Sequence, residues 1–89
     1  MAGVEKILEE MRRRPAGVRF VDLARVCRHF FGEPRQRGTS HQVFATPWRG
    51  DPRVNIQDDH GRAKAYQVRQ VLAAVDRLAT EAGEEQGAR

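Results

Sequence analysis

Cysteine and long apolar runs are scarce in this 89-residue chain. Its single cysteine, Cys27, cannot form an internal disulfide, which excludes a disulfide-stapled secreted domain. No apolar run approaches the roughly 20 residues of a membrane-spanning helix. The stretch MAGVEKILEE is also too acidic for a signal peptide. We therefore expect a cytoplasmic protein without a membrane segment.

Sequence motifs for nucleotide and zinc binding are missing as well. The chain contains neither G-x-x-x-x-G-K-[ST] nor G-x-G-x-x-G, and His29, His41 and His60 do not combine with Cys27 in a zinc-ligand spacing. The two acids and the histidine at 58–60 could hold a cation, but neighbouring side chains in one turn are more often simply solvated. We expect no cofactor and no bound metal.

Acidic residues are few in the middle of the chain. Residues 12–77 hold fourteen Arg or Lys side chains against six Asp or Glu, whereas the formal net charge of the whole chain is only +4. Most of these cations are arginines, whose planar guanidinium can bind phosphate oxygens through two hydrogen bonds. Such a basic segment favours a polyanionic partner. A composition bias with a solvated basic face explains the charge equally well.

Apolar spacing divides the chain into helices and short strands. Val4, Ile7, Leu8 and Met11 recur at the spacing of one helical face, and Pro15 follows them. Similar patterns predict a helix at 20–31, strands at 34–38, 40–46 and 53–57, and a helix at 64–79. The expected fold is α+β, in the order α-α-β-β-β-α, with a three-stranded antiparallel sheet packed by helices. We expect residues 1–80 to form one domain and 81–89 a disordered acidic tail.

His41 opens the second predicted strand, directly after a Gly-Thr-Ser turn. Successive strand residues point to opposite faces, so His41 and Phe44 lie on different sides. Phe44 has the larger apolar area to bury, and we therefore expect it to face the core and His41 to face solvent. On the strand at 53–57, the apolar side chains should face inward and the polar ones outward. Cys27 lies within a helical apolar stripe, which predicts a buried, unreactive thiol.

An exposed histidine beside arginines suits proton transfer on RNA. Imidazole exchanges protons near neutral pH, and RNA carries its own nucleophile, the 2′-OH. Cleavage also needs positive charge around the phosphate, for which Arg35, Arg37 and Arg53 are candidates, together with backbone N–H groups of the glycine turn. Ser40 could orient the ring or bind a phosphate oxygen. On chemistry alone, a strand-edge histidine that makes one hydrogen bond is the commoner case.

Two aromatic residues, Trp48 and Tyr66, could stack on bases. Half-buried packing explains Trp48 equally well, and for Tyr66 we expect packing.

The segments VRFVDLARVCRHFFGEPRQRGTSHQVF, RVNIQ and KAYQVRQVL resemble the HicA family of bacterial toxins, and the resemblance covers residues 7–78. Its most specific part is GTSHQVF, with a Ser-His pair after a glycine. HicA proteins are the toxic halves of two-gene toxin–antitoxin modules. The sequence departs from the family pattern at Gln42, where many members have a second histidine, and at QDDHGR, where many have a Pro-basic-His segment.

The resemblance implies a double-stranded-RNA-binding-domain-like fold and a metal-independent mRNA endoribonuclease whose catalytic residue is His41. It implies mRNA and a HicB-like antitoxin protein as partners. A non-catalytic RNA-binding module that uses the same basic face is the alternative, and a DNA-binding regulator is less favoured because no turn-linked pair of helices is evident. The residues expected to contact RNA are Arg35, Arg37, Gly38, Ser40, Arg53 and Lys64.

Overall fold

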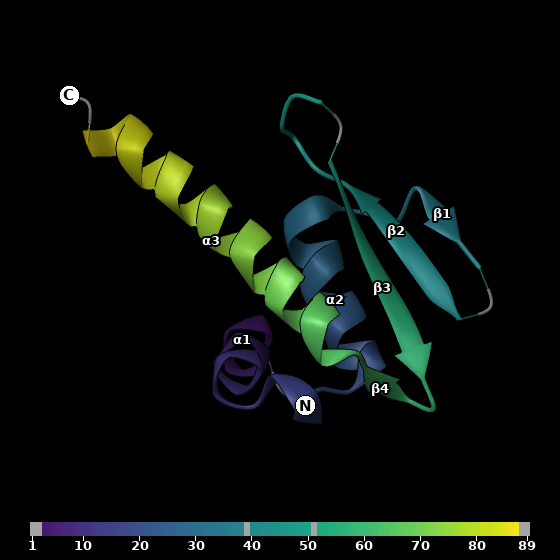
Figure 1. Cartoon of the computed structure of the whole chain (residues 1–89). Coiled ribbons are helices and arrows are strands. Elements are labelled where there is room, and N and C mark those ends of the chain that lie inside the picture. Colours follow the sequence, from purple (N-terminus) through teal and green to yellow (C-terminus); the bar gives the residue numbers. More distant parts are fainter. Residues whose placement is uncertain (1–2, 39, 51, 88–89) are drawn as a thin grey trace.

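A computed structural model describes residues 3–38, 40–50 and 52–87, with the backbone alone at 36–37 and 82–87. Within these residues, three α-helices pack against an antiparallel sheet with strand order β1-β2-β3-β4 (Figure 1). The elements are α1 (Val4–Arg13), the 3₁₀ turn η1 (Pro15–Gly17), α2 (Phe20–Phe31), β1 (Gln36–Arg37), β2 (His41–Ala45), β3 (Arg53–Asp59), β4 (Arg62–Ala63) and α3 (Ala65–Gly87). The α+β class and the order of the main elements are confirmed.

The two amino-terminal helices bury the residues that their apolar spacing predicts. Ile7 and Met11 of α1 are buried, and the helix ends before the turn η1, which begins with a proline. In α2 the buried set includes Leu23 and Cys27, and the helix ends at Gly32, whose φ of 84° favours glycine. Burial raises the pKa of the Cys27 thiol to about 12. The thiol is therefore protonated at neutral pH, as the predicted unreactive cysteine should be.

The central hairpin of β2 and β3 has one face in the core. Phe44 and Val54 are cross-strand partners and belong to the buried cluster that also contains residues of α2. His41, three positions before Phe44, is exposed on the opposite face, so its predicted outward orientation is confirmed. Gln42, which replaces the second histidine of the resembling family, has a buried Oε1 atom without a hydrogen-bond partner among the described residues.

The strand predicted at 53–57 is longer than expected. β3 continues through Asp59 and pairs with β4, so that only His60 and Gly61 form the turn. Their φ angles of 54° and 88° are those of a type I′ hairpin, the turn that matches the twist of antiparallel strands. The Asp58 carboxylate accepts a hydrogen bond of 2.6 Å from the Gly61 N–H. This acid therefore stabilises the turn.

The last helix is longer than its predicted range. A glycine-containing acidic sequence led us to end it near Ala79, but α3 continues through Gly87. The predicted end is wrong because glutamate, alanine and glutamine are good helix formers, and a single glycine such as Gly83 costs only about 1 kcal/mol. Residues 88–89, the end of the expected disordered tail, lie outside the described residues.

The helices are also joined to one another at the surface. Arg12 of α1 donates two hydrogen bonds, of 3.1 and 2.7 Å, to the Asp76 carboxylate of α3.

In the part of the chain that the structure describes, no helix is both long and apolar enough to cross a membrane.

Candidate functional site

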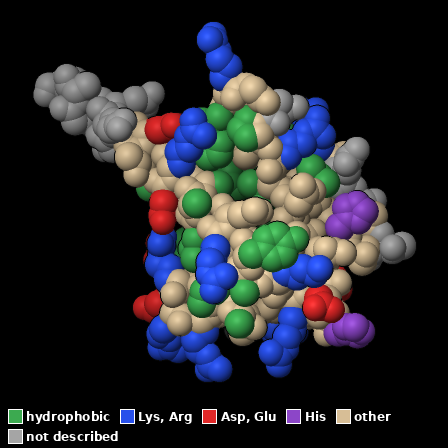
Figure 2. Space-filling model, viewed as in Figure 1, with side chains coloured by type: hydrophobic (Ala, Val, Ile, Leu, Met, Phe, Trp, Pro, Cys, Tyr) green, Lys and Arg blue, Asp and Glu red, His purple; other side chains and the backbone are tan. Residues whose placement is uncertain are grey.

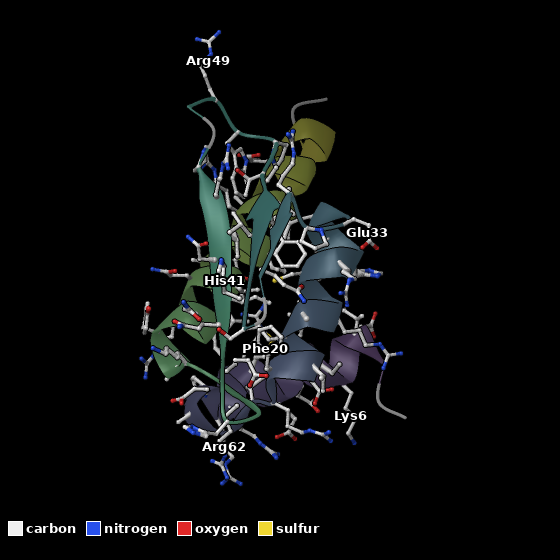
Figure 3. The ribbon with its side chains drawn as sticks, turned by 90° about the vertical axis from the view of Figure 1, so that its right-hand side faces the viewer. Lys6, Phe20, Glu33, His41, Arg49 and Arg62 are labelled. Atoms are coloured by element: carbon white, nitrogen blue, oxygen red, sulfur yellow. The ribbon has the colours of Figure 1, made fainter. Side chains whose placement is uncertain are left out.

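His41 projects from the outer face of the sheet at the start of β2. Figure 3 shows it on the side away from α2, about midway along the molecule between Arg49 and Arg62. The Gly38 N–H donates a hydrogen bond of 2.8 Å to the His41 carbonyl, which closes the chain onto itself just before β2. The Ser40 carbonyl accepts a bond of 2.7 Å from the Asp58 N–H. His41 therefore lies on backbone that is tied to both neighbouring segments.

Gly38 also provides the space that the His41 ring occupies. A Cβ atom added at Gly38 would lie 2.7 Å from Cε1 and 3.0 Å from Nδ1 of that ring, closer than such atoms can approach. A glycine is thus needed for the ring to take this position. The Gly38 N–H, expected to contact RNA, is instead donated within the hairpin.

A hollow of about 400 Å³ opens beside the ring. β3 contributes side chains next to His41, because Gln57 is the cross-strand partner of His41. The amino-terminal part of α3 forms the opposite wall, with Tyr66 and Gln70 one helical turn apart. Among the described residues that line the hollow, His41 is the only titratable base, and the other polar side chains are amides and a phenol. The lining residues are His41, Asn55, Ile56, Gln57, Tyr66, Gln67 and Gln70.

A short chain of hydrogen bonds fixes the back of this hollow. Gln67 is buried, and its Oε1 accepts a bond of 2.7 Å from the Gln57 backbone N–H on the edge of β3. Its Nε2 donates to the Tyr66 hydroxyl at 3.3 Å. Since Oε1 must face a backbone donor, the amide has only one possible orientation. The Tyr66 oxygen is therefore an acceptor at the back of the hollow, and its own hydrogen is left to donate.

The arginines and Lys64 predicted to bind RNA lie at different distances from the ring. The Arg35 N–H bonds to the Val43 carbonyl, two positions along β2 from His41. Arg37 belongs to β1, but its side chain lies outside the described residues. Arg53 is at the far end of β3, four residues from the partner of His41, which corresponds to about 13 Å. Lys64 is half-buried before α3 and does not line the hollow.

Arg53 lies instead at a second hollow, of about 310 Å³, whose lining includes Trp48, Arg77 and, shared with the first, Gln70. The Arg77 guanidinium stacks over the Trp48 ring at 4.1 Å. Both residues donate to Glu81, at 2.8 and 3.0 Å, and these bonds lower the pKa of that carboxyl. Trp48 is therefore held by α3, as half-buried packing predicts.

The hollow beside His41 contains three residues that sequence reasoning did not assign to it: Asn55, Tyr66 and Gln70. Tyr66 was expected to pack, but the residue is 53% exposed and lines the hollow, so that expectation is wrong. Asn55 was placed on the outer face without a role. The spacing of Tyr66 and Gln70 could have shown from the sequence that they share one face of a helix. Periodicity does not show, however, which edge of the sheet that face meets.

Cations lie at separate places on this face. Figure 2 shows Lys and Arg side chains at the margin of the viewed face and also within it, with uncharged surface between them. Among the described residues, no group of three or more His, Cys, Asp or Glu side chains is placed to hold a metal ion. His60, the histidine of the acidic turn, is almost fully exposed, and its Nδ1 lies 3.0 Å from Oδ1 of Asp59.

Comparisons of this chain with protein-family models, with curated proteins and with solved structures find no match, so the arrangement of its own residues carries the functional argument.

Proposed function

We propose that this protein is a metal-independent endoribonuclease that cleaves mRNA, with His41 as its general acid–base residue. The observation that carries the proposal is the exposed His41 ring, which lies against Gly38 at the side of a polar hollow. No described residue forms a hydrogen bond to the ring, which leaves its nitrogens available for a substrate. A histidine that served only to pair with the protein would have a partner.

The chemistry needs little beyond this histidine and positive charge. The 2′-oxygen of RNA attacks the adjacent phosphorus and transfers its proton to the neutral ring as the bond to the leaving oxygen breaks, and that oxygen takes up a proton from the protonated ring or from water. Arg35, which directly precedes β1, and Arg37 of β1 are proposed to stabilise the charge on the phosphate. General acid–base catalysis of this kind commonly supplies about 10²–10⁴-fold in rate.

The resemblance to HicA toxins supports a biological setting for this activity. We propose that the protein is the toxin of a toxin–antitoxin module, that it acts on cytoplasmic mRNA and that a HicB-like antitoxin binds it. The Ser-His pair at 40–41, after Gly38, is the part of the sequence on which this proposal depends.

A non-catalytic RNA-binding module is the second candidate. The uncharged hydrogen-bonding groups around the hollow favour it, since Asn55, Gln57 and Gln70 can hold RNA without any proton transfer.

Cleavage in the presence of a chelator separates the two candidates. Purified protein should cut an mRNA substrate in EDTA at its rate in buffer, because the proposed steps use no metal ion. An RNA whose 2′-OH groups are methylated should bind but stay intact. Activity that disappears in EDTA and returns with one divalent ion would contradict the mechanism. A wild-type protein that binds RNA and never cuts it is the binding module.

A further inference from the structure

We propose that the hollow beside His41 binds a single unstacked RNA base from one of the two nucleotides that flank the scissile phosphate. This inference rests on the proposed function for the position of the scissile bond, and it assigns to the same site a ligand group that the nuclease reaction alone does not require.

The charge of the lining distinguishes a base from a phosphate. No arginine or lysine side chain that the structure describes lines this hollow, whereas a phosphate subsite usually contains at least one cation. Lys and Arg side chains lie at other places on the face shown in Figure 2, and Arg53 and Arg77 line the second hollow. The sugar–phosphate backbone therefore fits outside the hollow and an uncharged group fits within it.

The hydrogen-bonding groups of the lining match the edge of a base. Asn55 and Gln70 are exposed and Gln57 is half-buried, and each amide offers a donor and an acceptor side by side. Amide side chains pair with base edges through this arrangement. A volume of about 400 Å³ lies within the range of about 300–1,000 Å³ for small-ligand sites, and it is open enough to admit one flat ring system.

Tyr66 adds a flat surface and a hydroxyl donor. Its side chain is 53% exposed, whereas most large apolar side chains of this protein are buried or partly buried. Its oxygen accepts from Gln67, so its hydroxyl hydrogen is left for a ligand, and no described residue accepts it. A base that stacks on this ring would lie between α3 and the outer face of β3, next to His41.

Abasic substitution tests the pocket directly. A short RNA that the protein cuts at one bond is prepared with an abasic nucleotide at each position in turn, and single-turnover cleavage is measured. One flanking position should lose about 5- to 150-fold, the equivalent of the 1–3 kcal/mol that one stacked base contributes, and the other positions should lose little. Similar rates at every abasic position, on an RNA that is still cleaved, would overturn the pocket and leave the nuclease proposal standing.

Substitutions in the protein should reproduce this loss. Tyr66→Ala should slow cleavage of the intact RNA by a similar factor and should remove the effect of the abasic nucleotide, because both changes delete the same contact. Tyr66→Phe, which keeps the ring, should lose less. Gln70→Ala should also lower the rate, whereas Thr80→Ala, an exposed polar residue further along the same helix, should not. Fully additive effects of Tyr66→Ala and the abasic nucleotide would contradict the inference.

A binding measurement keeps the pocket testable if no cleavage is found. An RNA with 2-aminopurine at the critical position, or at successive positions, and 2′-O-methyl groups throughout cannot be cut. Its fluorescence should be quenched by the wild-type protein through stacking on Tyr66, and much less by Tyr66→Ala at equal RNA occupancy. Quenching without cleavage of the unmodified RNA would support the pocket and reject the nuclease. Equal quenching by both proteins would reject the pocket.

Discussion

The ring of His41 occupies a space that only a glycine at position 38 leaves open. The ring is the flexible end of its side chain, so an added methyl group can displace it without disturbing the backbone. Gly38 is therefore a positioning residue in this account, one that acts on the substrate through His41. The hydrogen bond from its N–H to the His41 carbonyl is independent of the side chain and should survive substitution.

Gly38→Ala should keep the fold and lose activity. A displacement of about 1 Å at a reacting group can cost about 10²-fold in rate, so single-turnover RNA cleavage should fall by about that factor. Gly17→Ala is the matched control, because its added Cβ would make only an ordinary contact, 3.8 Å from Arg14. Circular dichroism and a urea melt should show both variants folded. Wild-type cleavage by folded Gly38→Ala would contradict the positioning role.

For single residues, the sequence predicts which side chain of a strand faces the core when the side chains on the two faces differ clearly in apolar area. Phe44 and His41 alternate on one strand, and the larger apolar area decides which faces the core. The exposure of Tyr66 and the contact between Gly38 and His41 could not be predicted. The first depends on how α3 meets the edge of β3, and the second on how the chain closes before β2.

Among the elements, α2 and α3 each bury only some of the residues on their apolar stripes. Leu23 of α2 is fully buried, whereas Leu72 of α3 is only partly buried, although apolar periodicity places it within the helical stripe. Val68, Val71 and Val75 are the buried residues of that helix. A stripe in the sequence identifies the face of a helix, and the partner element decides which of its residues are enclosed.

Replacing each leucine by alanine should reveal this difference. Leu23→Ala should lower the free energy of unfolding by about 2–5 kcal/mol, the usual loss for a buried leucine that leaves a cavity. Leu72→Ala should lose about 1 kcal/mol, because its side chain gives up only part of its transfer free energy. Urea melts of the two variants and the wild type measure both values. Equal losses would show that the two positions are equally enclosed.

β4 and the end of α3 were not predicted for a related reason. β4 has two residues and therefore carries no periodicity, and its existence depends on the type I′ turn at His60 and Gly61. The carboxyl-terminal part of α3 has no apolar stripe to reveal it. Its first exposed acid, Glu81, is held instead by Trp48 and Arg77, which come together only in the folded chain.

At the scale of the whole molecule, the basic residues of the sequence do not gather into one patch on the face shown in Figure 2. The described Lys and Arg side chains of that face lie at separate places, at its margin and within it. Composition predicted a polyanionic partner but not where uncharged surface would separate the cations. The hollow beside His41 is lined by amide side chains, whereas Arg53 lines the second hollow.

The contact between Arg12 and Asp76 makes the packing of α1 on α3 depend on pH. The hydrogen bonds from Arg12 lower the pKa of Asp76 from its ordinary value of 3.8. This stabilisation is complete above the ordinary value and is lost as the pH falls through the lowered one. Both side chains are about half exposed, so the pair should contribute only about 0–1 kcal/mol.

Asp76→Asn should therefore be slightly less stable than the wild type at pH 7 and equally stable near pH 2. Urea melts at the two pH values measure the difference, and high salt at pH 7 should reduce it. A difference that persists unchanged at pH 2 would show that the substitution acts through something other than this ion pair.

Single-turnover cleavage of an mRNA substrate by His41→Ala tests the central claim most directly. His29→Ala and His60→Ala are the matched controls, because both replace exposed histidines that do not line the hollow. The account predicts that all three variants fold, that His41→Ala loses about 10²–10⁴-fold in rate and that the controls lose far less. Cleavage at nearly the wild-type rate by folded His41→Ala would contradict it.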